Sequence, residues 1–254
     1  MIDPLVADDP LEPTSTSAAI NGVRISSRII PAGGALRGGD WCEAFAVSED
    51  VVALSIGDVC GHGIEKFAAM FAIRGAIRDA ALDGLDPAQT LAQVNQLLYR
   101  RDPGEIATAI LALLDTRQRS MIYANAGHPP PLVAGPHGTL LLEYPEPDLP
   151  LGIVPDFMPA IHALSLPAAT LLVFYTDGVS ESERDSVQGT SRLLAAATFA
   201  RDFPNLPTAE TIEALTLSTA SHFDDAAILT ARMPLLPITR NRHATANVLH
   251  VTRL

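Results

Sequence analysis

Short apolar segments of strand composition occur in pairs along this chain, and helical segments, also in pairs, separate them. Residues 44–47 and 51–56 flank the polar turn Ser48-Glu49-Asp50 and predict a hairpin. Residues 106–114 and 121–124 form a second pair across the polar segment 115–120. Strand pairs interrupted by helix pairs predict an α+β domain, in which sheets pack on each other with helices outside.

The remaining elements follow from composition and helix signals. Further strands are expected at residues 23–30, 139–142, 170–175 and 226–231. Helices are expected at residues 64–82, from residue 87 onward, at 191–200 and at 208–221. The helix at 64–82 has few polar positions, so we expect it to be heavily buried. Asp86-Pro87-Ala88-Gln89 predicts a helix start, with Asp86 as the N-cap and Gln89 reaching back to it.

Composition excludes several classes of protein. The chain of 254 residues is 48% hydrophobic, which excludes disorder throughout, and its two cysteines exclude a disulfide scaffold. A net charge of −12 argues against nucleic acid as the main partner, because phosphate backbones are bound by clustered Lys and Arg. The uncharged windows 120–142 and 157–176 contain Pro, His and polar residues, so we interpret them as loops joined to buried strands. We therefore expect a cytoplasmic protein without a membrane segment.

The two ends of the chain have opposite charge. Residues 1–20 are acidic and then rich in Ser, Thr and Ala, and predict a disordered tail. Residues 234–254 contain Arg240, Arg242 and Arg253 without any acid, and predict a basic tail. Two solvated tails, or tails that attract each other or a partner, are both consistent with this pattern. Residues 21–233 are expected to form one domain.

Acidic residues stand beside glycines or at the ends of apolar strands. Asp40 closes a glycine turn, Asp58 and Asp177 each follow an apolar strand, and the pair Asp224-Asp225 directly precedes the last strand. Each site taken alone is also consistent with an ordinary turn, because Asp and Gly are common turn residues. If the fold gathers them, their repulsion requires a compensating cation. A set of carboxylates suits Mg²⁺ or Mn²⁺ rather than zinc, but the spacing does not show that they converge.

Six motifs that contain these acids follow one another in a fixed order. They are Gly38-Gly39-Asp40-Trp41, Ile56-Gly57-Asp58-Val59-Cys60-Gly61-His62-Gly63, Tyr123-Ala124-Asn125-Ala126-Gly127-His128-Pro129-Pro130-Pro131, Leu149-Pro150-Leu151-Gly152, Tyr175-Thr176-Asp177-Gly178-Val179 and Asp224-Asp225. Together they resemble the metal-dependent protein phosphatases of type 2C (PPM), within them the bacterial branch named for stage II sporulation protein E. The resemblance covers about residues 22–233. It implies an αββα sandwich, with two packed, mostly antiparallel sheets flanked by helices.

The resemblance also implies a site for two Mn²⁺ or Mg²⁺ ions. By motif position, Asp58 would bridge both ions and Val59 would bind one through its backbone carbonyl. Asp40, Asp177 and the last acidic pair would complete the ligands. Within that pair we expect Asp224 to bind metal and Asp225 to lie behind it, although the motif leaves this choice open. Asp58, Asp40 and Asp177 are the expected catalytic residues.

The implied activity is hydrolysis of phosphoserine or phosphothreonine on a protein. A hydroxide that bridges the two ions would attack phosphorus directly, without a phosphoenzyme. In this branch the substrate is typically a small anti-sigma-factor antagonist of the STAS fold. The alternatives are an inactive module that binds a phosphoprotein, and an enzyme acting on a small phosphoester. Regulation is expected through a separate protein in trans or through a homodimer.

Five further residues near the motifs allow more than one interpretation. His62 is either a general acid or a turn residue, and Arg37 either contacts phosphate or lies free on the surface. His128 is expected to fix a loop between strands. Cys42 and Cys60 each follow a proposed ligand by two residues, so oxidation of the two thiols is one hypothesis for a switch. The alternative is that both are small residues that fill a sheet.

Overall fold

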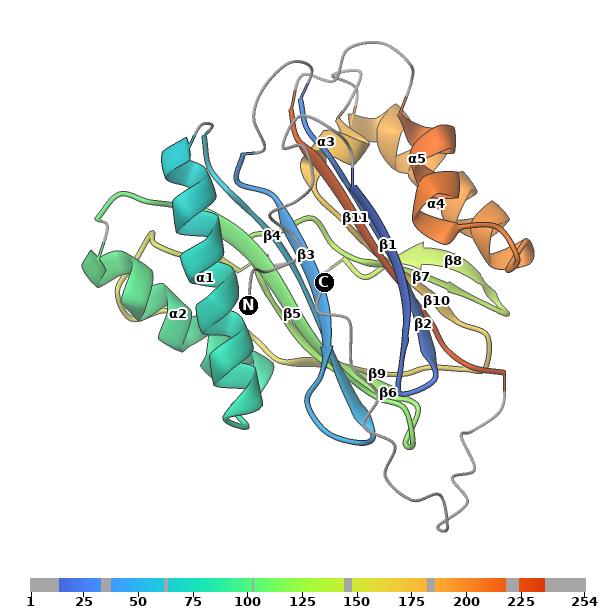
Figure 1. Ribbon diagram of the computed structural model, residues 1–254, viewed down its shortest axis with the longest axis horizontal. Helices are drawn as coiled ribbons and strands as arrows, with labels where there is room; N and C mark the ends of the chain where they lie inside the picture. The colour runs from blue at the N-terminus through green and yellow to red at the C-terminus, as the bar shows by residue number, and fades with distance from the viewer. Residues whose placement is uncertain are drawn as a thin grey trace, which may run out of the picture.

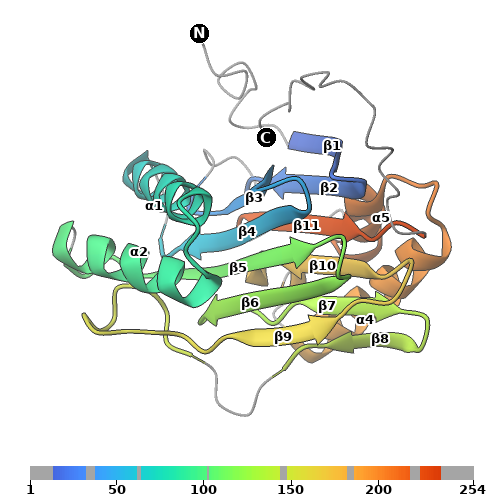
Figure 2. The same ribbon diagram turned by 90° about the horizontal axis from the view of Figure 1, so that it is seen from below.

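Two antiparallel sheets stack face to face, and helices cover their outer faces (Figures 1 and 2). The computed structural model describes residues 14–32, 38–61, 64–101, 103–143, 148–181, 186–217 and 224–235. The αββα sandwich predicted from the sequence is confirmed.

Among the described residues, six strands form the first sheet, sheet A. In order across the sheet they are β1 (Thr14–Ile20), β2 (Val23–Ile30), β11 (Ala226–Arg232), β10 (Leu171–Tyr175), β7 (Leu132–Gly135) and β8 (Gly138–Leu141). The neighbouring strands β10 and β11 run antiparallel, with Tyr175 opposite Ile228. The end of β10 therefore lies beside the start of β11.

The second sheet, sheet B, contains five strands within the same described ranges. In order they are β3 (Trp41–Ala46), β4 (Val51–Val59), β5 (Ala107–Asp115), β6 (Ser120–Ala126) and β9 (His162–Ser165). The predicted hairpin is confirmed as β3 and β4, whose register places Trp41 opposite Gly57. The start of β3 is thereby fixed next to the end of β4.

The helices divide between the two outer faces (Figure 2). Sheet B is covered by α1 (Ile64–Leu82) and α2 (Pro87–Arg101), and sheet A by α4 (Ser186–Asp202) and α5 (Thr208–Thr216). The short helix α3 (Asp177–Ser180) directly follows β10. The start of α2 is as predicted: Gln89 N donates to Asp86 Oδ1 at 2.9 Å, and Asp86 N donates to Gln89 Oε1 at 3.2 Å.

The buried apolar side chains form three layers, one between the two sheets and one between each sheet and the helix pair that covers it. Leu54 and Ile110 of sheet B pack with Phe174 and Leu229 of sheet A in the central layer. All four side chains are at most 1% exposed. Because helices cover the outer faces, the central strands are apolar on both sides, which explains their continuous apolar sequences.

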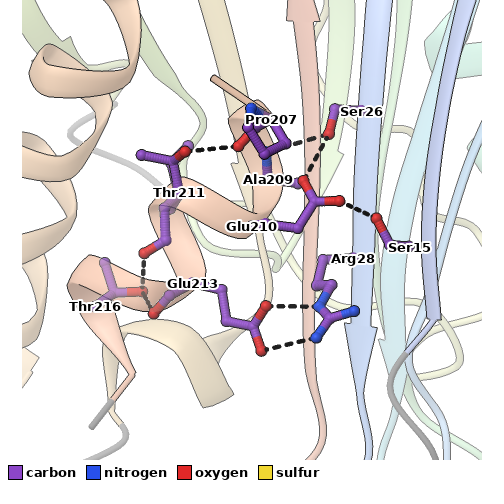
Figure 3. Close-up of polar contacts among 10 residues, drawn as sticks. Ser15, Ser26, Arg28, Pro207, Ala209, Glu210, Thr211, Glu213 and Thr216 are labelled. Atoms are coloured by element: carbon purple, nitrogen blue, oxygen red, sulfur yellow. Dashed lines mark hydrogen bonds and ion pairs between the residues drawn. The ribbon is translucent and has the colours of Figure 1, made fainter. Parts of the chain in front are cut away.

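Polar contacts fasten α5 to the outer face of sheet A (Figure 3). Arg28 of β2 donates to both carboxylate oxygens of Glu213, at 2.6 Å through Nε and 3.3 Å through Nη2. Glu210, one turn earlier, accepts from Ser15 of β1 and from Ser26 of β2. Bidentate pairing between a planar guanidinium and a carboxylate fixes orientation as well as distance. The helix is therefore held against β1 and β2.

Three strands differ from the expectations. The segment Thr14–Ile20, expected within the tail, forms β1 and pairs along its whole length with β2. The tail prediction is wrong there because strand pairing, not composition, decides the structure of this segment; residues 1–13 and 236–254 lie outside the described residues. The strands β7 and β9 were not predicted, because they lie in the uncharged windows 120–142 and 157–176. The Pro, His and polar residues of these windows favour loops over further strands.

Helix α1 is less buried than its composition predicts. Met70, Ile73 and Ile77 face sheet B, whereas Phe71 and Leu82 are 38% and 49% exposed. The prediction of heavy burial is wrong, because a helix on the outer face of a sheet is covered on one side only. No helix in the described part of the chain is long and apolar enough to cross a membrane.

Candidate metal centre

Strand pairing brings the predicted acidic residues to one end of the sandwich. Asp40 directly precedes β3 and Asp58 lies near the end of β4, so the antiparallel register sets them side by side. Asp177 follows β10, and the pair Asp224-Asp225 precedes β11, which gives the same arrangement in sheet A. A buried hydrogen bond joins the two halves, since Thr176 Oγ1 donates to Asp40 Oδ2 at 2.8 Å.

The glycine before Asp40 permits a close approach of two predicted ligand atoms. A Cβ on Gly39 would lie 2.2 Å from the carbonyl oxygen of Val59 and 2.7 Å from Asp58 Oδ1. Val59 N also donates to Gly39 O at 3.2 Å, which holds the two segments together. The Asp58 carboxylate and the Val59 carbonyl thus converge over Gly39, where any side chain would displace them.

A second glycine plays the same part in sheet A. A Cβ on Gly178 would lie 2.0 Å from the backbone oxygen of Asp225, so the turn after β10 packs directly on the turn before β11. Burial raises the pKa of Asp177, and the charge of Asp224 raises it further. These two carboxylates are therefore electrostatic neighbours at the end of sheet A.

Asp40 and Asp58 form a hydrogen-bonded carboxyl pair. Burial raises the pKa of Asp40 well above its ordinary value, and the charge of Asp58 raises it further. Burial also raises the pKa of Asp58, to which Asp177, Asp224 and Asp225 add. Two buried carboxylates in contact cannot both remain ionised without a proton or a cation to offset their repulsion.

Asp224 and Asp225 have different surroundings. Asp225 accepts from Ala32 N at 2.7 Å through Oδ1 and from Gly38 N at 2.5 Å through Oδ2. Both of its oxygens are thus engaged with the backbone that leads into Asp40. Asp224 is exposed, and its Oδ1 accepts from Asp225 N at 2.9 Å. These contacts favour Asp224 as the ligand and Asp225 as a support for the loop.

The donor set fits a hard divalent cation. Carboxylate oxygens and the Val59 carbonyl are the ligands that Mg²⁺ and Mn²⁺ prefer, and the buried Asp40–Asp58 pair has the unbalanced charge that such an ion would offset. In the described ranges, no three acidic, His or Cys side chains already lie close enough together to hold an ion. Asp40 and Asp58 are instead bonded to each other.

His128 contacts the strand that is paired with the Asp58 segment. It is buried, and its Nδ1 lies 2.8 Å from Thr108 Oγ1, in the residue paired with Asp58 across β4 and β5. Asn125 exchanges two hydrogen bonds of 2.8 Å with the His128 backbone. Burial lowers the pKa of His128 to about 3, so the ring is neutral. This agrees with its expected role in fixing a loop.

The two cysteines do not form a redox pair. Cys42 of β3 is buried and lies opposite Ile56 of β4. Cys60 is exposed and lies four residues after Ile56, just beyond the end of β4. At ~3.3 Å per residue, Cys60 lies about 13 Å along the strand direction from the position opposite Cys42, while a disulfide requires Cα atoms less than ~7 Å apart. The disulfide switch is therefore wrong, and Cys42 fills the sheet interior. His62 and Arg37 lie outside the described residues.

Thr176 was not singled out from the sequence. Its position between an apolar strand and Asp177 could have indicated a role, because a buried hydroxyl there requires a hydrogen-bond partner inside the fold.

Two stacked antiparallel sheets with helices outside are the architecture of the PPM phosphatases. A structure of RsbX in complex with magnesium has this fold, with a TM-score of 0.68 and 17% identity over 87% of this chain and 100% of that chain. The crystal structure of the RsbU and RsbW domains of Rv1364c from Mycobacterium tuberculosis matches with a TM-score of 0.72 and 29% identity, over 88% of this chain and 62% of that chain.

Within that class, the sequence profile described as Stage II sporulation protein E (SpoIIE) matches residues 48–234, and the chain belongs to this family. The phosphoserine phosphatase RsbP of Bacillus subtilis (strain 168) is 28% identical over 149 residues, which are 56% of this chain and 36% of RsbP. Protein IcfG of Synechocystis is 25% identical over 63% of this chain and 30% of its own length. The chain spans about a third of the length of these curated relatives.

Proposed function

We propose that this chain is a metal-dependent protein serine/threonine phosphatase. The observation that carries the proposal is the buried Asp40–Asp58 carboxyl pair at the end of the sandwich, with Asp177 and Asp224 beside it. Family membership supports the same activity, since a relative is named a phosphoserine phosphatase.

The ligands in this proposal are Asp40, Asp58, the Val59 carbonyl, Asp177 and Asp224. When bound, two divalent ions lower the pKa of a shared water and offset the charge of a phosphate ester. Asp58 is assigned to both ions in this proposal, because it is hydrogen-bonded to Asp40 and is the electrostatic neighbour of Asp177, Asp224 and Asp225. Hydrolysis is then direct attack of water on phosphorus, and the chain's own part is to orient the ligands and the ester.

The substrate in this proposal is a phosphorylated regulatory protein, a small anti-sigma-factor antagonist of the STAS fold. Its support is the family resemblance, together with relatives and neighbours that carry Rsb names. A phosphatase domain that acts on a protein also requires a partner surface. A regulatory protein in trans, or a homodimer, remains part of the proposal, as does a location in the cytoplasm.

The test is Mn²⁺-dependent hydrolysis of p-nitrophenyl phosphate and of a phosphoserine STAS-domain protein. Asp58→Asn and Asp177→Asn are expected to lower kcat/KM by at least ~100-fold, because each removes charge where the ions are held. Asp79→Asn, a change of an exposed acid on α1, is the matched control and is expected to leave the rate unchanged.

A second pair of variants separates the last two acids. Asp224→Asn is expected to raise the Mn²⁺ concentration needed for half-maximal rate by about 10- to 100-fold, whereas Asp225→Asn should mainly lower thermal stability. A folded wild-type protein that binds the phosphoprotein but hydrolyses neither substrate would refute the proposal and favour the binding module.

A further inference from the structure

Thr176 connects the two sheets at the candidate metal centre. It lies between β10 and Asp177 and is completely buried. Its Oγ1 donates to Asp40 Oδ2 at 2.8 Å and accepts from Ala227 N, also at 2.8 Å. Thr176 N donates in turn to Ala227 O at 3.0 Å. One side chain therefore touches the segments that carry Asp40, Asp177 and the last acidic pair.

The contact with Ala227 is consistent with the bond that Thr176 donates to Asp40. A hydroxyl has one proton to donate, and the amide of Ala227 supplies a proton of its own, so it occupies an acceptor position on Oγ1. The hydroxyl proton of Thr176 is left for Asp40 Oδ2. This bond holds one oxygen of Asp40, whose carboxyl is also hydrogen-bonded to Asp58.

We propose that Thr176 is a positioning residue of the metal centre, which orients the Asp40 carboxylate through its hydroxyl and thereby sets the affinity for the divalent ion. The inference rests on the proposed function. Partners that orient metal ligands typically contribute about 10- to 100-fold to metal affinity. The hydrogen bonds of Thr176 also join the two sheets. They link Asp40, which precedes β3 of sheet B, to β10 and β11 of sheet A.

The chain offers a matched control in Thr230. This threonine of β11 is also buried, 1% exposed, and its Oγ1 donates to the backbone oxygen of Ser26 at 3.0 Å. Thr230→Val removes a buried hydroxyl from β11, and Thr176→Val removes one directly after the neighbouring strand β10. They differ in the acceptor that loses its donor, which is the Ser26 carbonyl in one case and the proposed ligand Asp40 in the other. Thr176→Val also removes the acceptor of Ala227 N, so its cost in stability is expected to be the larger one.

The experiment measures Mn²⁺ binding directly, by calorimetric titration of the metal-free full chain, with thermal unfolding in EDTA as a parallel measurement. Thr176→Val is expected to raise the Kd for Mn²⁺ by about 10- to 100-fold, and Thr176→Ser, which retains the donor, to restore it to within about threefold. Thr230→Val is expected to change the Kd by less than about twofold while also lowering thermal stability. If Thr176→Val does not fold, Thr176→Cys replaces it as a variant with a much weaker donor.

Equal Mn²⁺ affinity of wild type and the folded Thr176→Val or Thr176→Cys variant would overturn the inference and leave the proposed function intact. An equal loss of affinity in Thr230→Val would also overturn it, because burial of any hydroxyl would then suffice. A wild-type protein that neither binds Mn²⁺ nor hydrolyses phosphoserine would remove the proposed function and this inference together.

Discussion

Replacing Asp58 by Asn is expected to stabilise the metal-free protein. The pKa of Asp58 is raised from its ordinary value of 3.8 to about 6, by burial first and then by the neighbouring carboxylates. A rise of about two units corresponds to about 3 kcal/mol between the folded and unfolded states. Since Asp40 stays buried in the variant, part of the repulsion persists, and we expect a gain of about 1–3 kcal/mol in the free energy of unfolding.

The sign of the effect depends on pH. Between pH 3.8 and about 6 the folded protein binds a proton at Asp58 that the unfolded chain has already released, so the stability of the metal-free protein falls as pH rises through this window. Above about 6 the loss is complete. The amide introduced by Asp58→Asn does not titrate, so the difference between the two proteins is largest at about pH 8 and shrinks as the pH is lowered toward about 5.

The assay is urea unfolding in EDTA at several pH values, followed by circular dichroism. Asp79→Asn on the exposed side of α1 serves as the control and is expected to match wild type. Added Mn²⁺ at about 100 times its Kd should stabilise wild type by about 2.7 kcal/mol and leave Asp58→Asn nearly unchanged. Superimposable unfolding curves for wild type and Asp58→Asn at about pH 8 in EDTA would show that no repulsion is stored at this site.

Two further predictions concern packing and acid stability. Gly57→Ala is expected to lower the free energy of unfolding by at least about 1–3 kcal/mol, because the new methyl would lie 2.1 Å from the Trp41 ring. Gly75→Ala in α1 meets nothing within 4 Å and should instead add about 0.5–1 kcal/mol, so equal effects in chemical denaturation would contradict the argument. His128 remains neutral in the fold down to about pH 3, so below pH ~6.5 only the unfolded chain binds its proton and stability falls by up to about 1.4 kcal/mol per pH unit. His128→Gln is expected to unfold with a shallower acid dependence, and an unchanged slope would rule out this source.

Local signals were sufficient to predict much of the fold. The bounds of α1 and the reciprocal bonds between Asp86 and Gln89 at the start of α2 follow from neighbouring residues alone. The strand β1 could not be found in this way, because its polar, alternating sequence is stabilised by pairing with β2 and by contacts to α5. Its structure depends on residues that are distant in the sequence.

The candidate site, like the fold, was predictable from the sequence only in part. Each acid could be recognised from its strand end or glycine turn, and the family resemblance assigned it a role. The contacts that organise the acids were invisible, because Thr176 and Asp40 are separated by 136 positions and Asp225 and Gly38 by 187. Single polar contacts between residues at the ends of two stacked sheets leave no periodic pattern in the sequence.

The distribution of hydrogen-bond donors gives a physical ranking of the acids as ligands. Asp225 has a backbone N–H on each oxygen, and Asp40 has the Thr176 hydroxyl on one oxygen. Asp58 is hydrogen-bonded to Asp40, which lowers its pKa, and bears the repulsion of three other acids, which raises it. A carboxylate whose charge is already offset by donors gains less from a cation than one opposed by like charges. The fold therefore supports Asp225 with backbone donors and leaves the strongest demand for a cation at the buried Asp40–Asp58 pair.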